Sequence, residues 1–396
     1  GYNAGCPIPM PLIHNSFQNF ASAEILDKGE ESMLHKERFQ KLVEILNEQK
    51  LDAVFLAPSS DLKYITGLDF RSDSRLKGAL ISKEGESFFL CPSLHRDDVE
   101  SVREEMHILE WNDVDWFQGA FRRGLQLVGL DGHLRIAFTR GIEAGDMIEA
   151  VEGLNVQCVN GFSLLFPMRS IKSKEELELM RRASAMNDKM MESLAVYLRP
   201  GLYEDEIIKF IMNFHESHGG NPRVPGVATG VNSSKPHYGR DNNRAIEEND
   251  IVLVDCGGWY DGYSHDMTRT FFVGAPTEEQ RKVYEIVLEA QLAAEEKVAV
   301  GAIPSEIDKT ARDIITEYGY GDSFNHRLGH GIGMDGHEAP YISQGNHVPL
   351  VEGNCFSIEP GIYLKGKFGV RIEDLVMLTE SGREIINHYP KHLQVL

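Results

Sequence analysis

Two carboxylates lie within a segment that otherwise has the composition of a buried hairpin. Asp255 ends an apolar run, and Asp266 lies in the next β-patterned run, after the turn signal Asp261-Gly262. A turn at Asp261-Gly262 sets Asp266 opposite Gly257, with Asp255 as its diagonal neighbour at about 7–8 Å. A turn at Tyr260-Asp261 pairs Asp255 directly with Asp266, with Cβ atoms about 5 Å apart. Both registers put the two acids on one face.

A second ribbon repeats this arrangement further along the sequence. Glu359 and Glu373 each follow a β-patterned run, and a short loop separates the two runs. A three-residue loop centred on Gly366 sets Glu359 opposite Glu373. Taken singly, any of the four acids is better explained as an edge-strand charge that faces solvent. Taken as two pairs with apolar flanks, they indicate burial.

Carboxylates that face each other in an apolar sheet need a positive partner, because burial and like charge raise their pKa values or destabilise the fold. Two divalent ions neutralise four carboxylates. His330, in Gly329-His-Gly-Ile-Gly, adds an imidazole where the backbone can approach an ion closely. Alone, such a histidine is more often a surface or core residue. With four carboxylates it suits Mn²⁺, Co²⁺, Fe²⁺ or Zn²⁺, and the oxygen-rich set favours Mn²⁺.

The elements that must position these residues form the second of two units. Ser173 and Glu176 make a capping-box pattern that opens a long helix and marks the domain boundary. Helical and β-patterned segments then alternate. The helical patterns cover residues 174–194, 207–215, 277–287 and 304–318, and the β-patterned segments cover 251–273 and 355–378. The sequence predicts an α+β domain over residues 171–396, with all four acids in its β-patterned segments.

The sequence before Ser173 indicates an α/β unit. Its patterns predict helices at 34–46, 96–105 and 115–127 and strands at 52–57, 79–81 and 87–91. They indicate a three-layer α/β domain over residues 29–170. Residues 1–28 contain three prolines and little periodicity, which predicts an extended N-terminal arm.

Composition excludes several classes of protein. The chain has 396 residues, with 40 basic and 61 acidic side chains and a net charge of −21. Such a field opposes non-specific binding to nucleic acid or an anionic membrane, so we expect neither partner. The five cysteines form no CxxC pair and indicate reduced thiols. No apolar run approaches the roughly 20 residues that span a bilayer. We therefore expect a cytoplasmic protein.

Five motifs occur together in one order. They are Asp255-Cys-Gly with Asp266-Met-Thr-Arg-Thr, Gly329-His-Gly-Ile-Gly, His337-Glu-Ala-Pro, Ile358-Glu-Pro-Gly and Val370-Arg-Ile-Glu-Asp. In this order and spacing the sequence resembles the pita-bread metallopeptidases, and its two-domain layout resembles their proline-specific branch, with aminopeptidase P, Xaa-Pro dipeptidase and creatinase. The resemblance implies a creatinase/prolidase-type α/β N-terminal domain before a pita-bread catalytic domain.

The resemblance also implies a role for each matching acid. Asp255 would bind one metal ion through both carboxylate oxygens, while Asp266 and Glu373 would bridge two ions. His330 and Glu359 would complete the shell of the other ion. The implied cofactor is therefore two divalent ions per subunit, with Mn²⁺ favoured over Co²⁺, Zn²⁺ or Fe²⁺.

Four further residues match the family's substrate pocket. His237, His326 and His337 would face the substrate, and Arg371 would support the bridging acids at the same pocket. Of these, His237 and His337 would act in catalysis together with Glu359. Without the resemblance, the same residues are explained as surface histidines, a turn contact and an exposed strand arginine.

The implied activity is hydrolysis of the amide bond between an N-terminal residue and proline, above all in Xaa-Pro dipeptides. A hydroxide that bridges the two ions would attack the carbonyl, and Glu359 would carry its proton towards the leaving nitrogen. The implied partners are a short proline-containing peptide and a second copy of the chain in a homodimer. Phe70 and Arg71 are candidates to edge the neighbour's cleft.

Three other functions fit part of the pattern. Aminopeptidase P acts on longer X-Pro peptides, and Tyr341 here follows Pro340 where several bacterial proline dipeptidases carry arginine. This leaves Arg240 or Arg327 as candidates to face the product's carboxylate. The second alternative is creatinase-like hydrolysis of a small non-peptide C–N bond. The third is a non-enzymatic peptide-binding module, which the complete ligand set disfavours.

Overall fold

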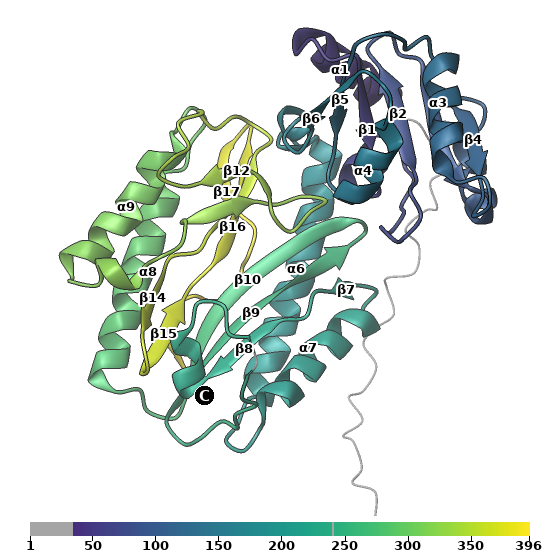
Figure 1. Ribbon diagram of the computed structural model, residues 1–396. Helices are drawn as coiled ribbons and strands as arrows, with labels where there is room; N and C mark the ends of the chain where they lie inside the picture. Colours follow the sequence, from purple (N-terminus) through teal and green to yellow (C-terminus); the bar gives the residue numbers. More distant parts are fainter. Residues whose placement is uncertain (1–34, 240) are drawn as a thin grey trace, which may run out of the picture.

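The computed structural model describes residues 35–239 and 241–396. A six-stranded sheet with its helices forms the N-terminal part, and a larger group of twisted strands with flanking helices forms the remainder (Figure 1). The predicted arm at 1–28 and the candidate Arg240 lie outside the described residues. Within the described ranges, no helix is both long and apolar enough to cross a bilayer. The four described cysteines are free thiols.

The N-terminal sheet has the strand order β4-β3-β2-β1-β5-β6. Its strands are β1 (Ala53–Leu56), β2 (Gly78–Ser82), β3 (Ser87–Pro92), β4 (His107–Trp111), β5 (Leu134–Phe138) and β6 (Val156–Asn160). Alternate residues of β1 point to opposite faces. Val54 packs in a core with residues of α1 (Lys36–Glu48) and α2 (Ser60–Thr66). Phe55 packs on the other face with residues of α3 (Phe117–Leu127) and α4 (Ala144–Val151). This is the three-layer arrangement that the sequence predicts.

The helix predicted over residues 96–105 is wrong. Short 3₁₀ helices occupy Ser93–His95 and Asp97–Val102 instead. Only Val99 and Val102 are buried in the second of them, and a three-residue spacing matches the three residues per turn of a 3₁₀ helix.

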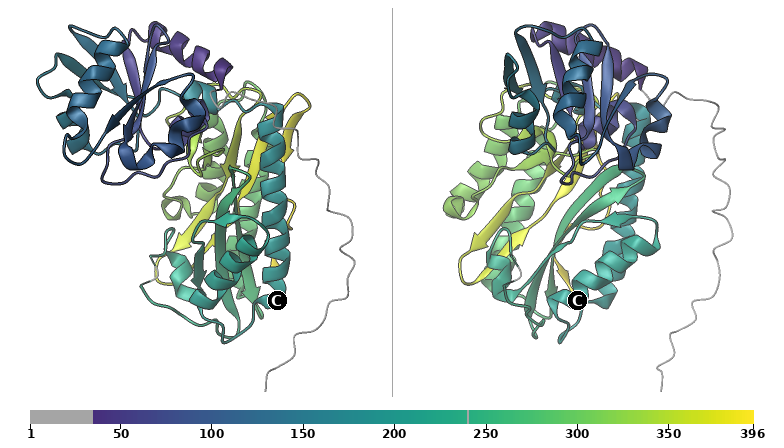
Figure 2. Two further views of the ribbon diagram at one scale, coloured as in Figure 1. Left: turned by 90° about the vertical axis from the view of Figure 1, so that its right-hand side faces the viewer. Right: turned by 45° about the vertical axis from the view of Figure 1, so that its right-hand side comes forward.

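Four long helices flank the strands of the second part (Figure 2). They are α6 (Lys174–Tyr197), α7 (Glu204–Ser217), α8 (Glu278–Lys297) and α9 (Pro304–Glu317), with the single turn α5 (Phe166–Arg169) before them. The predicted capping box is confirmed, because Ser173 caps α6 with Glu176; Thr277 caps α8 with Gln280 in the same way. These reciprocal bonds satisfy amides that a helix start otherwise leaves unpaired.

The strands between these helices form two five-stranded sheets and a separate ribbon. The first sheet contains β7 (Asn221–Pro222), β8 (Gly226–Thr229), β9 (Asp250–Tyr260), β10 (Tyr263–Val273) and β18 (Gln394–Val395). The second contains β11 (Gly329–Gly331), β12 (Glu338–Ile342), β13 (Cys355–Ile358), β16 (Asp374–Thr379) and β17 (Gly382–Ile385). The ribbon pairs β14 (Gly361–Leu364) with β15 (Phe368–Arg371).

The register of β9 and β10 selects one of the two predicted turns. Asp266 lies opposite Gly257, so Asp255 is its diagonal neighbour and the turn is Asp261-Gly262. Both turn residues have positive φ, 49° and 83°, as a two-residue type I′ turn requires. The alternative turn at Tyr260-Asp261, with Asp255 paired to Asp266, is therefore wrong.

The second ribbon has the predicted register. Gly361 pairs with Arg371 in the ribbon, and Ile358 pairs with Asp374 between β13 and β16. Glu359 and Glu373 therefore lie opposite each other, between the paired strands β13 and β16 and the paired strands β14 and β15. The two amides turn outward: Glu359 N donates to Leu328 O, and Glu373 N donates to Thr268 O at 3.1 Å. The last bond belongs to an isolated bridge that joins the two sheets.

A buried ionic cluster attaches the N-terminal part beside this junction. The Arg169 guanidinium pairs with Asp61 at 2.7 Å and with Glu338 at 2.6 Å. Lys172 Nζ lies 2.8 Å from the other oxygen of Glu338. Asp61 belongs to α2 and Glu338 to β12, so the cluster connects a helix of the N-terminal part to the strand that follows His337.

Candidate metal centre and substrate pocket

The four predicted acids and His330 converge in one place. Asp255 comes from β9, Asp266 from β10 and His330 from β11, while Glu359 follows β13 and Glu373 follows β15. Their donor atoms fall into overlapping groups in which all atoms lie within 4.8 Å of one another. These groups are Asp255, Asp266 and Glu373; His330, Glu359 and Glu373; and Asp266, His330 and His337. Because the first two groups share Glu373, the arrangement matches two neighbouring metal positions.

Burial makes this cluster unfavourable without added positive charge. Burial and the negative charge of Asp255 raise the pKa of Asp266 to about 7. Burial, together with the charge of Asp255, raises the pKa of Glu359 to about 7 against the lowering effect of Arg371. The pKa of Glu373 is raised well above its usual range by burial and by the neighbouring acids. Its Oε1 is buried without a hydrogen-bond partner among the described residues. The donor set therefore fits divalent cations, which would satisfy that oxygen.

The imidazole of His330 is oriented for coordination. Its Nδ1 lies 3.0 Å from the carbonyl of Gly331, to which a ring N–H donates. This leaves the lone pair on Nε2, which lies 3.4 Å from Glu359 Oε1 and 4.0 Å from Glu373 Oε1. In many metal-binding histidines, the ring nitrogen that does not bind the metal donates its N–H in this way, and this hydrogen bond fixes the tautomer.

The hydroxyl group of Thr268 and the guanidinium group of Arg371 bind the candidate ligands through hydrogen bonds and an ion pair. Thr268 Oγ1 donates to Glu373 Oε2 at 2.7 Å and accepts from Arg371 Nε at 3.2 Å. Arg371 also pairs with Asp255 Oδ2 at 2.7 Å and donates to Tyr363 Oη at 2.9 Å. Although burial alone raises the pKa of Asp255, Arg371 and Arg223 bring it below the usual range. The predicted residue Arg371 thus lines the pocket as a partner of an acid.

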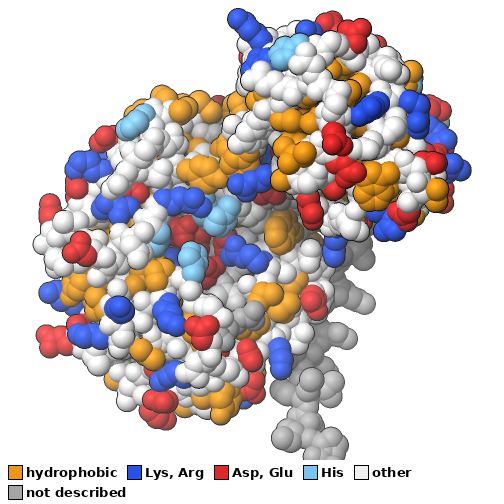
Figure 3. Space-filling model, viewed as in Figure 1, with side chains coloured by type: hydrophobic (Ala, Val, Ile, Leu, Met, Phe, Trp, Pro, Cys, Tyr) orange, Lys and Arg blue, Asp and Glu red, His pale blue; other side chains and the backbone are white. Residues whose placement is uncertain are grey.

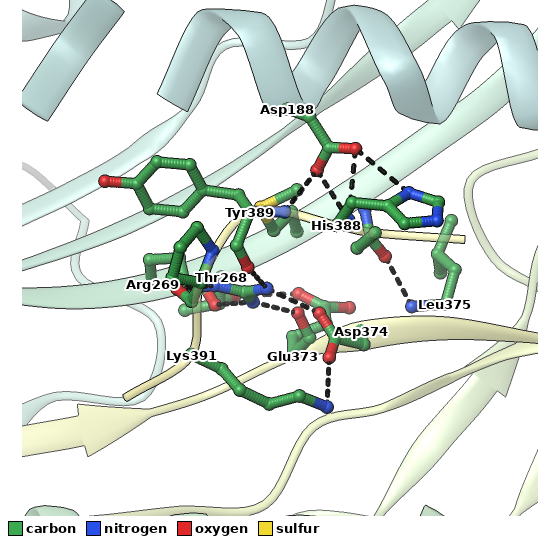
Figure 4. Close-up of polar contacts among 12 residues, drawn as sticks. Asp188, Thr268, Arg269, Glu373, Asp374, Leu375, His388, Tyr389 and Lys391 are labelled. Atoms are coloured by element: carbon green, nitrogen blue, oxygen red, sulfur yellow. Dashed lines mark hydrogen bonds and ion pairs between the residues drawn. The ribbon is translucent and has the colours of Figure 1, made fainter. Parts of the chain in front are cut away.

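A further buried network anchors the strands that carry these acids (Figure 4). Arg269 donates to the carbonyl oxygen of Glu373 at 2.6 Å, to Asp374 Oδ1 at 2.6 Å and to Tyr389 O at 2.7 Å. Asp188, on α6, accepts from the amide of Tyr389 at 2.9 Å. The segment after β17 is therefore tied to both β10 and α6 directly behind the acids.

The predicted pocket histidines lie around a cavity of about 720 Å³ that also contains the acids. His337 stacks on His330 with ring centroids 3.7 Å apart, and burial lowers its pKa to about 3. Burial lowers the pKa of His326 to about 4, and its Nε2 lies 3.1 Å from Tyr363 Oη. His237 lines the same cavity. In Figure 3, histidine and basic side chains surround a recessed group of acidic side chains on this face.

Sequence reasoning missed two charged residues of this pocket: Lys235 and, in contact with the acids, Arg223. It follows Pro222 of the short strand β7, and its Nη2 lies 3.0 Å from both Asp255 Oδ1 and Asp266 Oδ1. It carries no motif, because only the pairing of β7 with β9 brings it to the acids. Arg327, a predicted candidate for a carboxylate, contacts His337 Nδ1 at 3.1 Å and lies over the ring of Tyr341.

Comparison with known proteins identifies the class. Residues 178–380 match the model of metallopeptidase family M24, and residues 38–152 match the creatinase/prolidase N-terminal domain. The chain belongs to metallopeptidase family M24 and has the fold of that family's two-domain members. The predicted resemblance, the fold class and the assignment as an enzyme are confirmed.

Particular relatives cover nearly the whole chain. An uncharacterised peptidase of Staphylococcus aureus is 33% identical over 358 residues, which are 89% of this chain and 99% of the relative. A recombinant prolidase from Thermococcus sibiricus matches with a TM-score of 0.87 and 34% identity, covering 92% of this chain and 100% of that one. A dipeptidase from Pyrococcus horikoshii OT3 matches with a TM-score of 0.86 and 33% identity, covering 91% and 100%.

Proposed function

We propose that this peptidase is a dinuclear hydrolase that cleaves the amide bond between an N-terminal residue and proline, preferentially in Xaa-Pro dipeptides. The observation that carries the proposal is the convergence of four carboxylates and one imidazole around the unpartnered Glu373 Oε1. The substrate class is supported by structural relatives named prolidase and dipeptidase.

Two cation positions follow from the donor groups. Asp255, Asp266 and Glu373 would hold one ion, and Glu373 with Asp266, His330 and Glu359 would hold the other. Carboxylate oxygens predominate, so Mn²⁺ is the proposed ion. When bound, divalent ions polarise the scissile carbonyl and lower the pKa of the attacking water.

The remaining groups handle protons and developing charge. Arg327 can only donate, so the contact with His337 Nδ1 makes that nitrogen the acceptor and places the ring proton on Nε2. The Nε2–H of His337 is then a donor for the oxyanion of the tetrahedral intermediate, with His237, which lines the same cavity, as a second donor. Glu359 lines the cavity, so its carboxylate is placed to take the proton of the attacking water.

The leaving group explains why a proton carrier is needed. The nitrogen of an X-Pro bond belongs to a tertiary amide and leaves as a secondary amine, so it must be protonated as the bond breaks. Glu359 would deliver that proton. His326 would orient Tyr363, which in turn holds Arg371 against Asp255.

The test combines metal content with a small substrate panel. Protein loaded with Mn²⁺ should bind about two ions per chain and hydrolyse Ala-Pro, while Ala-Ala should be cleaved at least tenfold more slowly. Rates on Ala-Pro and on Ala-Pro-Ala-Ala separate a dipeptidase from an aminopeptidase P. Two bound ions with neither X-Pro substrate cleaved would reject the proposal.

We also propose the remaining predicted properties: a cytoplasmic homodimer with an arm at 1–28, an α/β domain at 29–170 and a catalytic domain at 171–396. Free thiols at all four described cysteines are consistent with a reducing compartment. Sedimentation equilibrium tests the dimer, and limited proteolysis tests the boundary near residue 170. A monomer, or first cleavage inside the described sheets, would contradict these proposals.

A further inference from the structure

Among the described residues, the Arg223 side chain forms its hydrogen bonds and ion pairs only with the candidate metal ligands Asp255 and Asp266. Its Nη2 lies 3.0 Å from Asp255 Oδ1 and 3.0 and 3.2 Å from the two oxygens of Asp266. Its backbone N–H donates to Gly257 O at 2.9 Å, which fixes the Cα beside the site. About a third of the side chain, 34%, remains exposed on the cavity wall.

Arg371 has a different environment. Besides Asp255, it donates to Thr268 Oγ1 at 3.2 Å, to Tyr363 Oη at 2.9 Å and to Pro236 O at 3.3 Å. None of these three partners is a candidate metal ligand. Within residues 35–239 and 241–396, the Arg223 side chain has no hydrogen-bond or ion-pair partner other than Asp255 and Asp266.

Metal binding therefore changes the surroundings of Arg223 more than those of Arg371. Arg223 contacts the two acids that would hold one ion, so the positive charges of the guanidinium and of a divalent ion would repel each other and compete for these carboxylates. Once the acids hold two ions, their four negative charges are neutralised. Arg223 is then an unpaired cation that lines the cavity beside the reacting carbonyl.

We propose that Arg223 is a specificity residue that binds a carboxylate of the substrate when metal ions occupy Asp255 and Asp266. The inference rests on the proposed function and names its substrate class: an X-Pro peptide with a carboxylate within reach of the cation. That carboxylate is either the C-terminal group of a dipeptide or the side chain of an acidic X residue. Both offer the two oxygens that a guanidinium binds well.

Other cations in the pocket are less suited to this role. Arg327 donates to the neutral ring of His337 and lies 4.7 Å from the centroid of the Tyr341 ring, so metal binding does not release it. Lys235 pairs with Asp241 at 3.1 Å at the rim. Among the basic side chains of the pocket that the structure describes, Arg223 alone has all its side-chain partners among the acids that would bind the ions.

The first experiment measures selectivity with Mn²⁺-loaded enzyme. It compares kcat/KM for Ala-Pro with Ala-Pro-amide, and for Asp-Pro with Asn-Pro. One of these two ratios should be about 10- to 100-fold in the wild type and fall close to 1 in Arg223→Met, chiefly through KM. The ratio that falls identifies the source of the carboxylate. Arg383→Met, at an exposed position far from the pocket, should keep both ratios.

Several outcomes would overturn the inference. The inference fails if the wild type is active but its kcat/KM ratio is no more than twofold in both substrate pairs. It also fails if Arg223→Met keeps both kcat/KM ratios of the wild type. Loss of the preference in Arg327→Met but not in Arg223→Met would assign the carboxylate to Arg327 instead. Wild type that cleaves none of the four substrates rejects the proposed function itself, which separates the two failures. Arg223→Gln gives the same comparison if the methionine variant does not fold.

A second readout does not depend on activity. Titration of metal-free protein with Mn²⁺ should show tighter binding to Arg223→Met than to the wild type, by about tenfold, because the wild type must first break its ion pairs with Asp255 and Asp266. Arg383→Met should match the wild type. Equal or weaker binding to Arg223→Met would show that the guanidinium does not compete with the ion, and the inference would fail.

Discussion

Thr268→Val tests whether the bridge between the two sheets sets the metal affinity. The substitution keeps the shape of the side chain and removes only its hydroxyl. That hydroxyl donates to Glu373 Oε2 at 2.7 Å and accepts from Arg371 Nε at 3.2 Å, and Thr268 is fully buried. A hydrogen bond to a charged group contributes about 1.5–3 kcal/mol, which corresponds to roughly 10- to 150-fold in an equilibrium constant. Loss of an outer-shell contact typically weakens metal binding about 10- to 100-fold. We expect the Mn²⁺ affinity of Thr268→Val to be about 10- to 100-fold lower than that of the wild type.

The assay is competitive Mn²⁺ titration of metal-free wild type and Thr268→Val, with circular dichroism to check folding. Thr310→Val is the matched control, because its hydroxyl bonds only the carbonyl of Glu306 on an exposed helix face. The control should bind Mn²⁺ as the wild type does. Affinity in Thr268→Val within about twofold of the wild type, with the fold intact, would refute the view that this hydroxyl orients Glu373.

Three further predictions follow from the buried charges. Glu359→Ala should lose about one bound ion per chain by elemental analysis and abolish turnover with the fold intact, whereas Glu352→Ala, at an exposed position, should change neither. Burial lowers the pKa of His215 from 6.5 to about 4, so the unfolded state binds more protons between these values and stability is lost as pH falls through them. Urea unfolding gives the free energy of unfolding at pH 7 and at pH 4.5. The decrease in this free energy between the two pH values should be about 2–3 kcal/mol smaller in His215→Gln than in the wild type, and an equal decrease would contradict the prediction. Arg169→Met should destabilise the protein by about 3–5 kcal/mol, because it leaves Asp61 and Glu338 as buried charges without their shared cation; thermal melting within 2 °C of the wild type would argue against it.

Local signals allowed much of the framework to be predicted. Ser173 with Glu176 is a capping box whose partners are three residues apart, so the start of α6 is visible in the sequence. The pairing of Glu359 with Glu373 follows from a short loop that fixes the register. The sequence alone leaves two registers open for the first hairpin. The backbone of Asp261 and Gly262, both with positive φ, decides between them.

Long-range contacts limit what the sequence predicts. Thr268 and Glu373 are 105 residues apart, and nothing in either segment specifies that their strands bridge. Arg223 has no motif and reaches the acids only through the pairing of β7 with β9. The segment 97–102 forms a 3₁₀ helix, whose three-residue spacing of the buried Val99 and Val102 cannot be told from an α-helical pattern over so short a run.

The network around Arg269 has a consequence for synthesis on the ribosome. Residues Tyr389 and Pro390 supply carbonyl acceptors for this buried guanidinium, and Lys391 pairs with Asp374 beside it. A nascent chain that has not yet extended to these residues would leave several donors of Arg269 unsatisfied in an apolar interior. Every candidate metal ligand precedes them in the sequence. Peptide-cleaving capacity should therefore arise only after this late segment has docked.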